Sequence, residues 1–212
     1  MHYTSVLFDL DGTLLDTLGD LTAAMNRTLT RHGLPERTRQ QMRAALGNGA
    51  RQLMELSVPA GTDGALFETL LAEYNADYAA HCRIETAPYP GVDALLQQLH
   101  AQGRKLAIVS NKPDEAVRAL RTEFFADTVP IAVGEKQGIR RKPAPDTLLT
   151  AMVQLGAERT STVYVGDSEV DIATARAANL PCISVLWGFR DRDVLERAGA
   201  QQFAADAGEL AR

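Results

Sequence analysis

From Pro88 onwards the chain alternates short apolar runs with longer stretches in which apolar residues recur at helical spacing. Short apolar runs favour buried strands, and the amphipathic stretches favour helices. The expected strands span residues 105–109, 131–133, 162–165 and 182–186, and a first strand lies at residues 6–8. The expected helices span residues 92–102, 114–123, 146–155, 170–178 and 191–198, and the last of them completes the pattern. This alternation predicts an α/β fold with a doubly wound parallel sheet, a Rossmann-like core.

A block of helical periodicity separates the first strand from the others. Leu18, Leu21, Met25 and Leu29 recur at the spacing of one helix face. Further helical stretches cover residues 38–46, 50–56 and 63–82, with no convincing strand between them. We therefore expect an α/β core made of residues 1–16 and 87–212, and a helical domain at residues 17–86 that is inserted after the first strand.

Composition and charge exclude several classes of protein. The 212 residues are 45% hydrophobic and carry a formal net charge of −5, and the longest basic run is Arg-Arg-Lys at residues 140–142. A nucleic-acid partner would need a basic face, so that class is disfavoured. No apolar run approaches the roughly 20 residues that cross a bilayer, so no membrane partner is expected. Two distant cysteines and an N-terminus without a signal pattern favour a cytoplasmic protein.

Two aspartates follow the first strand. Asp9 and Asp11 stand directly after the apolar residues 6–8 and precede Gly12 and Thr13. Aspartate is a poor strand former, so the pair marks the carboxyl end of the strand, where open α/β sheets bind their ligands. Two carboxylates at one edge repel each other, and a hard divalent cation such as Mg²⁺ would let both stay ionised. A polar Asp-Gly turn explains the same residues equally well when they are taken alone.

Polar residues also follow the strand expected at residues 105–109. Ser110, Asn111 and Lys112 offer a hydroxyl, an amide and backbone N–H groups ahead of a helix. Such groups can hold an anion at the start of a helix. A helix N-cap followed by a turn is the alternative interpretation.

Two further features carry charge. The strand expected at residues 162–165 is followed by an acidic run with Asp167 and Asp171, and helix capping explains one of these aspartates but not both. Lys142 ends a basic stretch that would ordinarily be a solvated loop. Pro143 and Pro145 restrict the backbone around Lys142 and so fix the direction in which its ammonium group points.

The ordered set of these features resembles the haloacid dehalogenase superfamily of phosphohydrolases. Its four motifs are matched, in order and spacing, by residues 9–13, 110–112, 142–143 and 166–171. The helical insert after the first motif is similar to the subclass with a four-helix cap over the active site. Within the superfamily the chain resembles the phosphoglycolate phosphatases and their near relatives, through residues 8–17, 47–49, 110–113 and 187–190.

The resemblance implies a Mg²⁺-dependent phosphomonoester hydrolase. It implies that Asp9 is the nucleophile, which forms an aspartyl-phosphate, and that Asp11 is the general acid and base. It further implies that Mg²⁺ is bound by Asp9, Asp167 and the backbone carbonyl of Asp11. The phosphoryl group would be bound by Ser110, Asn111 and Lys142. Asp171 would orient Lys142 or a metal-bound water, and Thr13 would position Asp11.

The helical insert is expected to select the leaving group. Asn48 and Arg51 are candidates for contacts with a substrate carboxylate, although a solvent-facing helical arginine explains Arg51 as well. The implied partner is a small phosphorylated metabolite, 2-phosphoglycolate by resemblance, and the implied state is a monomer or a homodimer. These expectations rest on the resemblance rather than on the pattern of residues.

Three other functions fit parts of the same pattern. A phosphosugar mutase similar to β-phosphoglucomutase would depend on a bisphosphate and give an isomer as product. A pyrophosphatase is a close relative within the superfamily. A receiver-type signalling domain also uses paired acids, a hydroxyl residue and a lysine, but it is much shorter and has no helical insert.

Overall fold

The computed structural model describes residues 3–211, which form two compact units. The first, here called the core unit, combines the N-terminal segment up to Asp16 with the chain from Pro88 onwards. The second, here called the helical unit, is Thr17–Ala87. The second passage between the units therefore lies one residue later in the chain than the boundary expected from the sequence. None of the helices in the described range is long and apolar enough to cross a membrane.

The core unit is built on one parallel sheet of six strands in the order β5-β4-β1-β6-β7-β8. The central strand β1 pairs with β4 on one side and β6 on the other, so Phe8 lies opposite both Ile108 and Val165. The predicted doubly wound parallel sheet is thus confirmed. Its strands are β1 (Ser5–Phe8), β4 (Lys105–Pro113), β5 (Ile131–Glu135), β6 (Thr162–Gly166), β7 (Cys182–Val185) and β8 (Gln202–Ala204).

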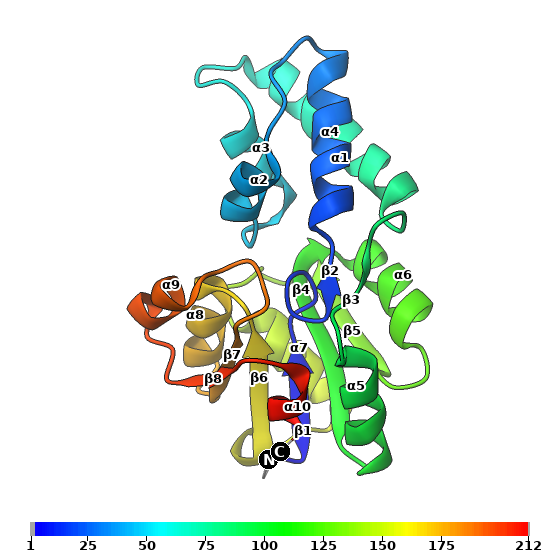
Figure 1. Cartoon of the computed structure of the whole chain (residues 1–212), viewed down its shortest axis with the longest axis vertical. Coiled ribbons are helices and arrows are strands. Elements are labelled where there is room, and N and C mark those ends of the chain that lie inside the picture. Colours follow the sequence, from blue (N-terminus) through cyan, green and yellow to red (C-terminus); the bar gives the residue numbers. More distant parts are fainter. Residues whose placement is uncertain (1–2, 212) are drawn as a thin grey trace. The chain divides into compact units, whose positions relative to one another are not determined.

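Helices cover both faces of this sheet, with α7 behind it and α10 in front of it in Figure 1. Side chains of Leu7, Val109 and Tyr164 from the sheet pack with Leu148 of α7 and Ala175 of α8 in one buried cluster. Burial on both faces is why the central strands consist of unbroken apolar runs. The helices of the core unit are α5 (Val92–Ala101), α6 (Asp114–Phe125), α7 (Asp146–Leu155), α8 (Glu169–Ala177), α9 (Arg192–Ala198) and α10 (Ala207–Leu210), with a short 3-10 helix at Arg159–Ser161.

Two expectations about the sheet were wrong. Strand β4 does not end at Val109 but continues to Pro113, with an irregular register in between: Val109 pairs with Val133, whereas Pro113 pairs with Glu135. Between these two pairs β4 advances by four residues and β5 by two, so β4 contains the extra residues of a β-bulge. The pattern also continues beyond α9 into β8 and α10, which the sequence did not indicate because the edge strand has only three residues and begins with a polar one.

The helical unit contains α1 (Leu18–Arg31), α2 (Arg39–Ala45), α3 (Gly49–Ser57) and α4 (Gly64–His81). A buried carboxylate, that of Asp77 in α4, accepts hydrogen bonds from Arg27 and Arg31 of α1 and so links the two long helices. A second buried carboxylate, that of Asp20, accepts hydrogen bonds from the backbone N–H groups of residues 84, 85 and 86. A separate two-stranded sheet pairs β2 (Leu15–Asp16) with β3 (Ala87–Pro88).

Candidate active site

The turn after β1 is tightly built around Gly12. The carbonyl of Leu10 accepts hydrogen bonds from the N–H groups of Thr13, Leu14 and Leu15, which folds the chain back at once. Gly12 has a φ of +90°, a conformation that residues with a side chain rarely adopt. A Cβ atom on Gly12 would also lie 2.4 Å from the Oδ2 atom of Asp167. The glycine therefore lets the turn approach the second acidic strand end closely.

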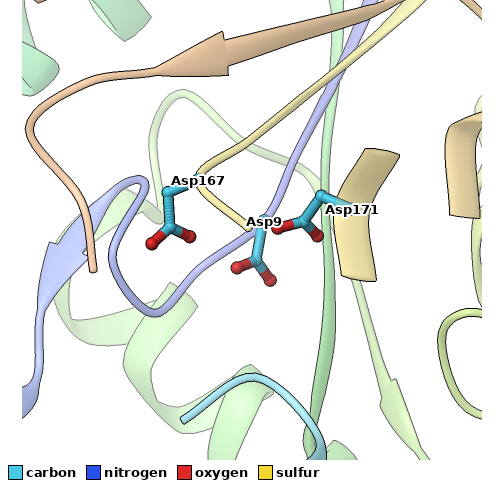
Figure 2. Close-up of side chains that lie close together, drawn as sticks. All are labelled: Asp9, Asp167 and Asp171. Atoms are coloured by element: carbon cyan, nitrogen blue, oxygen red, sulfur yellow. The ribbon is translucent and has the colours of Figure 1, made fainter. Parts of the chain in front are cut away.

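Three carboxylates meet at this edge of the sheet. Asp9 follows β1, Asp167 follows β6, and Asp171 stands in the first turn of α8. All three are buried, and each offers an oxygen atom within 4.8 Å of the others. Figure 2 shows the carboxyl group of Asp9 between those of Asp167 and Asp171. The parallel register brings them together, because the carboxyl ends of β1 and β6 lie side by side.

Lys142 enters this group from a loop and is only 3% exposed. Its Nζ atom lies 2.7 Å from Oδ1 of Asp9 and 2.7 Å from Oδ1 of Asp171, and it donates a hydrogen bond of 3.0 Å to the hydroxyl of Tyr164. The ammonium therefore has three oxygen partners, which match its three donor hydrogens. Lys142 is therefore buried and paired, unlike the lysine of a solvated basic loop, which is the ordinary interpretation of this stretch.

Asn111 holds the backbone of Lys142 rather than facing the acidic group. Its Nδ2 atom donates to the carbonyl of Lys142 at 3.0 Å, and its Oδ1 atom accepts from the N–H of Lys142 at 2.8 Å. Both ends of the side-chain amide are thus engaged with the neighbouring loop. The side-chain amide therefore positions Lys142, and phosphate binding by Asn111 stays a prediction.

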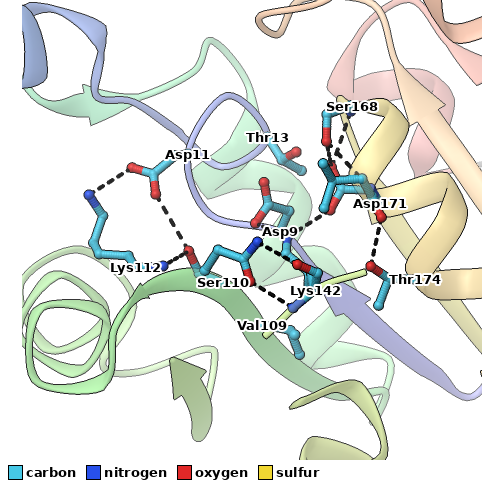
Figure 3. A network of polar contacts seen from close by, with 12 residues as sticks. Asp9, Asp11, Thr13, Val109, Ser110, Lys112, Lys142, Ser168, Asp171 and Thr174 are labelled. Carbon is cyan, nitrogen blue, oxygen red and sulfur yellow. Dashed lines mark hydrogen bonds and ion pairs between the residues drawn. The ribbon is translucent and has the colours of Figure 1, made fainter. Parts of the chain in front are cut away.

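Asp11 faces two residues of the irregular end of β4. The Nζ atom of Lys112 lies 3.1 Å from Oδ1 of Asp11, and the hydroxyl of Ser110 donates a long hydrogen bond of 3.5 Å to Oδ2. The backbone N–H of Lys112 donates to Ser110 Oγ at 3.2 Å. Figure 3 shows Asp11, Ser110 and Lys112 on one side of Asp9, and Lys142 and Asp171 on the other.

Asp171 has partners for both of its oxygen atoms. Oδ1 accepts from Lys142 and from the hydroxyl of Tyr164 at 2.9 Å, and Oδ2 accepts from the N–H and the hydroxyl of Ser168. Ser168 in turn accepts a hydrogen bond from the N–H of Asp171, which makes a capping box at the start of α8. The predicted role of Asp171 in orienting Lys142 agrees with these contacts.

Asp167 is held by the loop that follows β7. The N–H of Phe189 donates to its Oδ2 atom at 2.7 Å, and the hydroxyl of Thr13 donates to Oδ1 at 3.3 Å. The ring N–H of Trp187 donates to the carbonyl of Thr13 at 3.0 Å, which links the loop to the turn after β1. The hydroxyl of Thr13 therefore contacts Asp167, and its expected part in positioning Asp11 stays a prediction.

Burial and like charges make the ionised forms of two of these acids costly. Burial, reinforced by the charges of Asp171, Asp167 and Asp11, raises the pKa of Asp9 well above its usual range, although Lys142 opposes the rise. Burial and the charge of Asp171 likewise raise the pKa of Asp167 to about 7. Without a cation, the ionised forms of Asp9 and Asp167 are therefore less favourable than that of a solvent-exposed aspartate.

The other two charged groups stabilise each other. Burial alone would raise the pKa of Asp171, but the charge and hydrogen bond of Lys142 and the hydrogen bonds from Ser168 and Tyr164 lower it. Burial alone would lower the pKa of Lys142, but Asp171 and Asp9 outweigh that effect and raise it. Lys142 therefore stays positively charged and is paired chiefly with Asp171. Asp9 is compensated less well, which is why its pKa is raised.

The donor set fits a hard divalent cation. Mg²⁺ prefers oxygen ligands and binds through one or two carboxylates while keeping several waters. Asp171 is committed to Lys142 and Ser168, so Asp9 and Asp167 are the carboxylates of this group that could hold the ion. A positive charge placed between them would reverse the raised pKa values of both.

The two candidates in the helical unit have other surroundings. Asn48 is the N-cap residue of α3 and makes no side-chain capping hydrogen bond. Arg51 is exposed, and its guanidinium group makes two hydrogen bonds of 2.8 Å to the carboxylate of Glu68 and lies over the ring of Phe67. The guanidinium is thus engaged by a carboxylate of its own unit, and its expected contact with a substrate carboxylate stays a prediction.

Comparison with known families decides which family the chain belongs to. The model of the family described as haloacid dehalogenase-like hydrolase matches residues 6–185, which include all four acidic, hydroxyl and lysine motifs. The chain belongs to this family. The match extends through both units of the structure.

The relatives of this hydrolase are phosphatases. It is 37% identical over 187 residues to a phosphoglycolate phosphatase of Xanthomonas campestris pv. campestris, with 88% of this chain and 84% of the relative covered. It is 32% identical over 190 residues to an N-acetylmuramic acid 6-phosphate phosphatase of Pseudomonas aeruginosa, with 89% and 84% covered. A crystal structure from Lactobacillus delbrueckii subsp. bulgaricus, provisionally named as a phosphoglycolate phosphatase, is 37% identical with a TM-score of 0.94 and coverage of 100% and 98%. The protein is accordingly a phosphatase.

Two residues of the site were missed by the sequence reasoning. Tyr164 lies within a buried apolar strand, and a hydroxyl among valines is the signal that could have found it. Lys112 was treated only as part of the turn expected after residues 105–109. Its pairing with Asp11 involves the irregular end of β4, which the sequence did not predict. Both contacts depend on which strands are neighbours.

Proposed function

We propose that this haloacid dehalogenase-like hydrolase is a Mg²⁺-dependent phosphomonoester hydrolase that acts through an aspartyl-phosphate, with 2-phosphoglycolate as its substrate. The observation that carries the proposal is the position of Asp9 at the end of β1, between Asp167 and the pair formed by Lys142 and Asp171. A carboxylate held this way is oriented for attack, and it is surrounded by groups that can balance the charge of a phosphate.

In the first half of the reaction a carboxylate oxygen of Asp9 attacks phosphorus. The bond from Asp9 to phosphorus forms while the ester bond breaks, and Asp11 donates its proton to the departing alkoxide. In the second half a water molecule gives a proton back to Asp11 and attacks phosphorus, which releases Asp9 and inorganic phosphate. The side chain of Asp11 is held by Lys112 and Ser110, so it reaches both steps from one position.

Charge balance around the phosphate is divided among the other residues. Lys142 and Ser110 would bind the oxygen atoms of the transferring phosphoryl group, and Asn111 would support Lys142 through its backbone. Mg²⁺, held by Asp9, Asp167 and the backbone carbonyl of Asp11, would neutralise the repulsion between an anionic nucleophile and an anionic phosphate.

The substrate is proposed from the relatives, and two candidates differ in a useful way. Phosphoglycolate phosphatases are named among the relatives, and so is an N-acetylmuramic acid 6-phosphate phosphatase. Both substrates carry a carboxylate, but in 2-phosphoglycolate it is one methylene from the ester oxygen, whereas in the sugar phosphate it is far from it. We assign the selection of the leaving group in part to the helical unit, residues 17–87, with Asn48 as the candidate contact.

A substitution of each catalytic aspartate tests the chemistry. Asp9→Asn should abolish the Mg²⁺-dependent release of phosphate from p-nitrophenyl phosphate, and turnover near the wild-type level would refute the assignment of the nucleophile. Asp11→Asn should slow both half-reactions, so normal hydrolysis in that variant would contradict its role as acid and base. Circular dichroism of both variants separates loss of chemistry from loss of fold.

A panel of phosphate compounds tests the substrate. We expect kcat/KM for 2-phosphoglycolate to exceed that for N-acetylmuramic acid 6-phosphate, pyrophosphate and simple sugar phosphates. Dependence on an added bisphosphate, with a sugar-phosphate isomer as product, would instead favour a mutase, and the largest kcat/KM for pyrophosphate would favour a pyrophosphatase. A cytoplasmic location and a monomeric or homodimeric state stay predictions.

A further inference from the structure

Lys112 is a buried ammonium group that the proposed chemistry does not yet use. The residue is 8% exposed, and it belongs to the irregular end of β4, where the chain leaves the regular register. Its Nζ atom lies 3.1 Å from Oδ1 of Asp11, the proposed acid and base. A buried charge is costly to maintain, so a lysine in this place calls for an explanation.

Lys112 lies on the side of Asp11 where a leaving group would be. Figure 3 shows its ammonium group on the far side of Asp11 from the nucleophile Asp9. Attack in line with the departing oxygen puts the nucleophile and the leaving group on opposite sides of phosphorus. A leaving oxygen that takes a proton from Asp11 therefore carries the rest of the leaving group towards Lys112.

The other lysine at this edge is already fully engaged. Lys142 has Asp9, Asp171 and the hydroxyl of Tyr164 around its Nζ atom, and it faces the phosphoryl side of the site. In the helical unit, Arg51 is paired with Glu68. Of these three cations, Lys112 is the one next to the acid that protonates the leaving group.

We propose that Lys112 determines the specificity for an anionic leaving group by binding a carboxylate that lies one methylene from the ester oxygen. The proposal rests on the proposed function and adds a residue that recognises its substrate. A leaving group this small keeps its carboxylate close to the ester oxygen, and therefore close to the residues beside Asp11. The same ammonium contacts Asp11, and a substitution can therefore also disturb proton transfer.

The test compares two substrates that differ only in the carboxylate. In ethyl phosphate a methyl group replaces the carboxylate of 2-phosphoglycolate, and the carbon skeleton is otherwise the same. The readout is the ratio of kcat/KM for 2-phosphoglycolate to kcat/KM for ethyl phosphate, measured at saturating Mg²⁺. This ratio cancels any loss of proton transfer that both substrates share.

We expect Lys112→Met to lower this ratio by about 10- to 100-fold, the range for one hydrogen bond between charged groups. Lys112→Arg should retain much of the preference, because it keeps the positive charge. Lys105 lies at the opposite end of the same strand and donates to the carbonyl of Gly156, so Lys105→Met removes an equal charge and should leave the ratio unchanged. If Lys112→Met does not fold by circular dichroism, Lys112→Gln gives the same comparison.

The outcomes separate this proposal from the proposed function. If the wild-type enzyme prefers 2-phosphoglycolate and Lys112→Met keeps that preference, with both activities falling in parallel, Lys112 only holds Asp11 and the proposal is overturned. A wild-type ratio near one would refute the proposed substrate and this role together. If the ratio falls equally in Lys105→Met, the drop comes from the change in net charge, and the proposal is likewise overturned.

Discussion

Removing the hydroxyl of Tyr164 tests whether the position of Lys142 matters for the reaction. Tyr164 is fully buried in β6, and its hydroxyl accepts from Nζ of Lys142 at 3.0 Å and donates to Oδ1 of Asp171 at 2.9 Å. Burial and the neighbouring carboxylates raise the pKa of Tyr164 well above its usual range, so the group stays a neutral phenol that can both accept and donate. Tyr164→Phe deletes one oxygen atom and leaves the packing of the ring.

The size of the effect follows from the remaining partners. A hydrogen bond to a charged group contributes about 1.5–3 kcal/mol. After the substitution Lys142 keeps Asp9 and Asp171, and Asp171 keeps Lys142 and Ser168, so we take the lower end. A loss of about 1.5 kcal/mol in transition-state stabilisation lowers kcat/KM about tenfold. Because Lys142 is assigned to the phosphoryl group, the loss should be the same for every phosphomonoester.

The assay measures kcat/KM of Tyr164→Phe with 2-phosphoglycolate and with p-nitrophenyl phosphate, together with thermal unfolding. Tyr3→Phe is the matched control, since Tyr3 stands ahead of the amino end of β1, at the opposite edge of the sheet. A folded Tyr164→Phe enzyme with kcat/KM within twofold of wild type would refute the reasoning. A loss confined to one substrate would show that the hydroxyl acts on the leaving group instead.

Two further predictions concern pH. The pKa of Asp167 is raised to about 7 and that of Asp9 is raised as well, so at lower pH a cation must displace protons to bind. Calorimetry should find Mg²⁺ binding at least about tenfold weaker for each pH unit below 7. Equal affinity at pH 8 and pH 6 would exclude Asp167 as a ligand. In the helical unit, burial would raise the pKa of Asp77, but hydrogen bonds and charges of Arg27 and Arg31 lower it below its unfolded value. That stabilisation is present above the unfolded pKa and is lost as pH falls through the folded one. Asp77→Asn should therefore cost about 2 kcal/mol in the free energy of unfolding at pH 7, and the difference from wild type should shrink below about pH 4; a constant difference would contradict the assignment.

The strand ends of the core unit were predictable because their signals are local. Asp9 and Asp167 each follow a short apolar run, and parallel strands place their carboxyl ends at one edge whatever lies between them in the chain. The relation of Asp171 to Lys142 came from the family resemblance, with a metal-bound water as the alternative partner, and the two side chains are in contact in the structure. The proximity of these strand ends then follows from the order of the strands in the sheet.

The partners within the site were not predictable from local pattern. Asn111 reads as a possible anion-binding amide, yet its two hydrogen bonds go to Lys142, a residue 31 positions away. Thr13 stands next to Asp11 in the motif, but its hydroxyl reaches Asp167 across the strand pair. Side-chain direction at a strand end depends on register and on the neighbouring turn, and β4 is irregular at this point.

The charge at the carboxyl edge of the sheet explains why a divalent cation suits this site. Two ammonium groups face four carboxylates there, which leaves a deficit of two positive charges; the acids are Asp9, Asp11, Asp167 and Asp171, and the bases are Lys112 and Lys142. Each lysine contacts an acid proposed for catalysis, whereas Asp167 accepts hydrogen bonds from the neutral groups of Phe189 and Thr13, and burial and the charge of Asp171 raise its pKa to about 7. A doubly charged ion beside Asp9 and Asp167 would balance this deficit at the place where the two raised pKa values lie. With such a cation the proposed nucleophile Asp9 would stay ionised, and the same positive charge would let a phosphate dianion approach it.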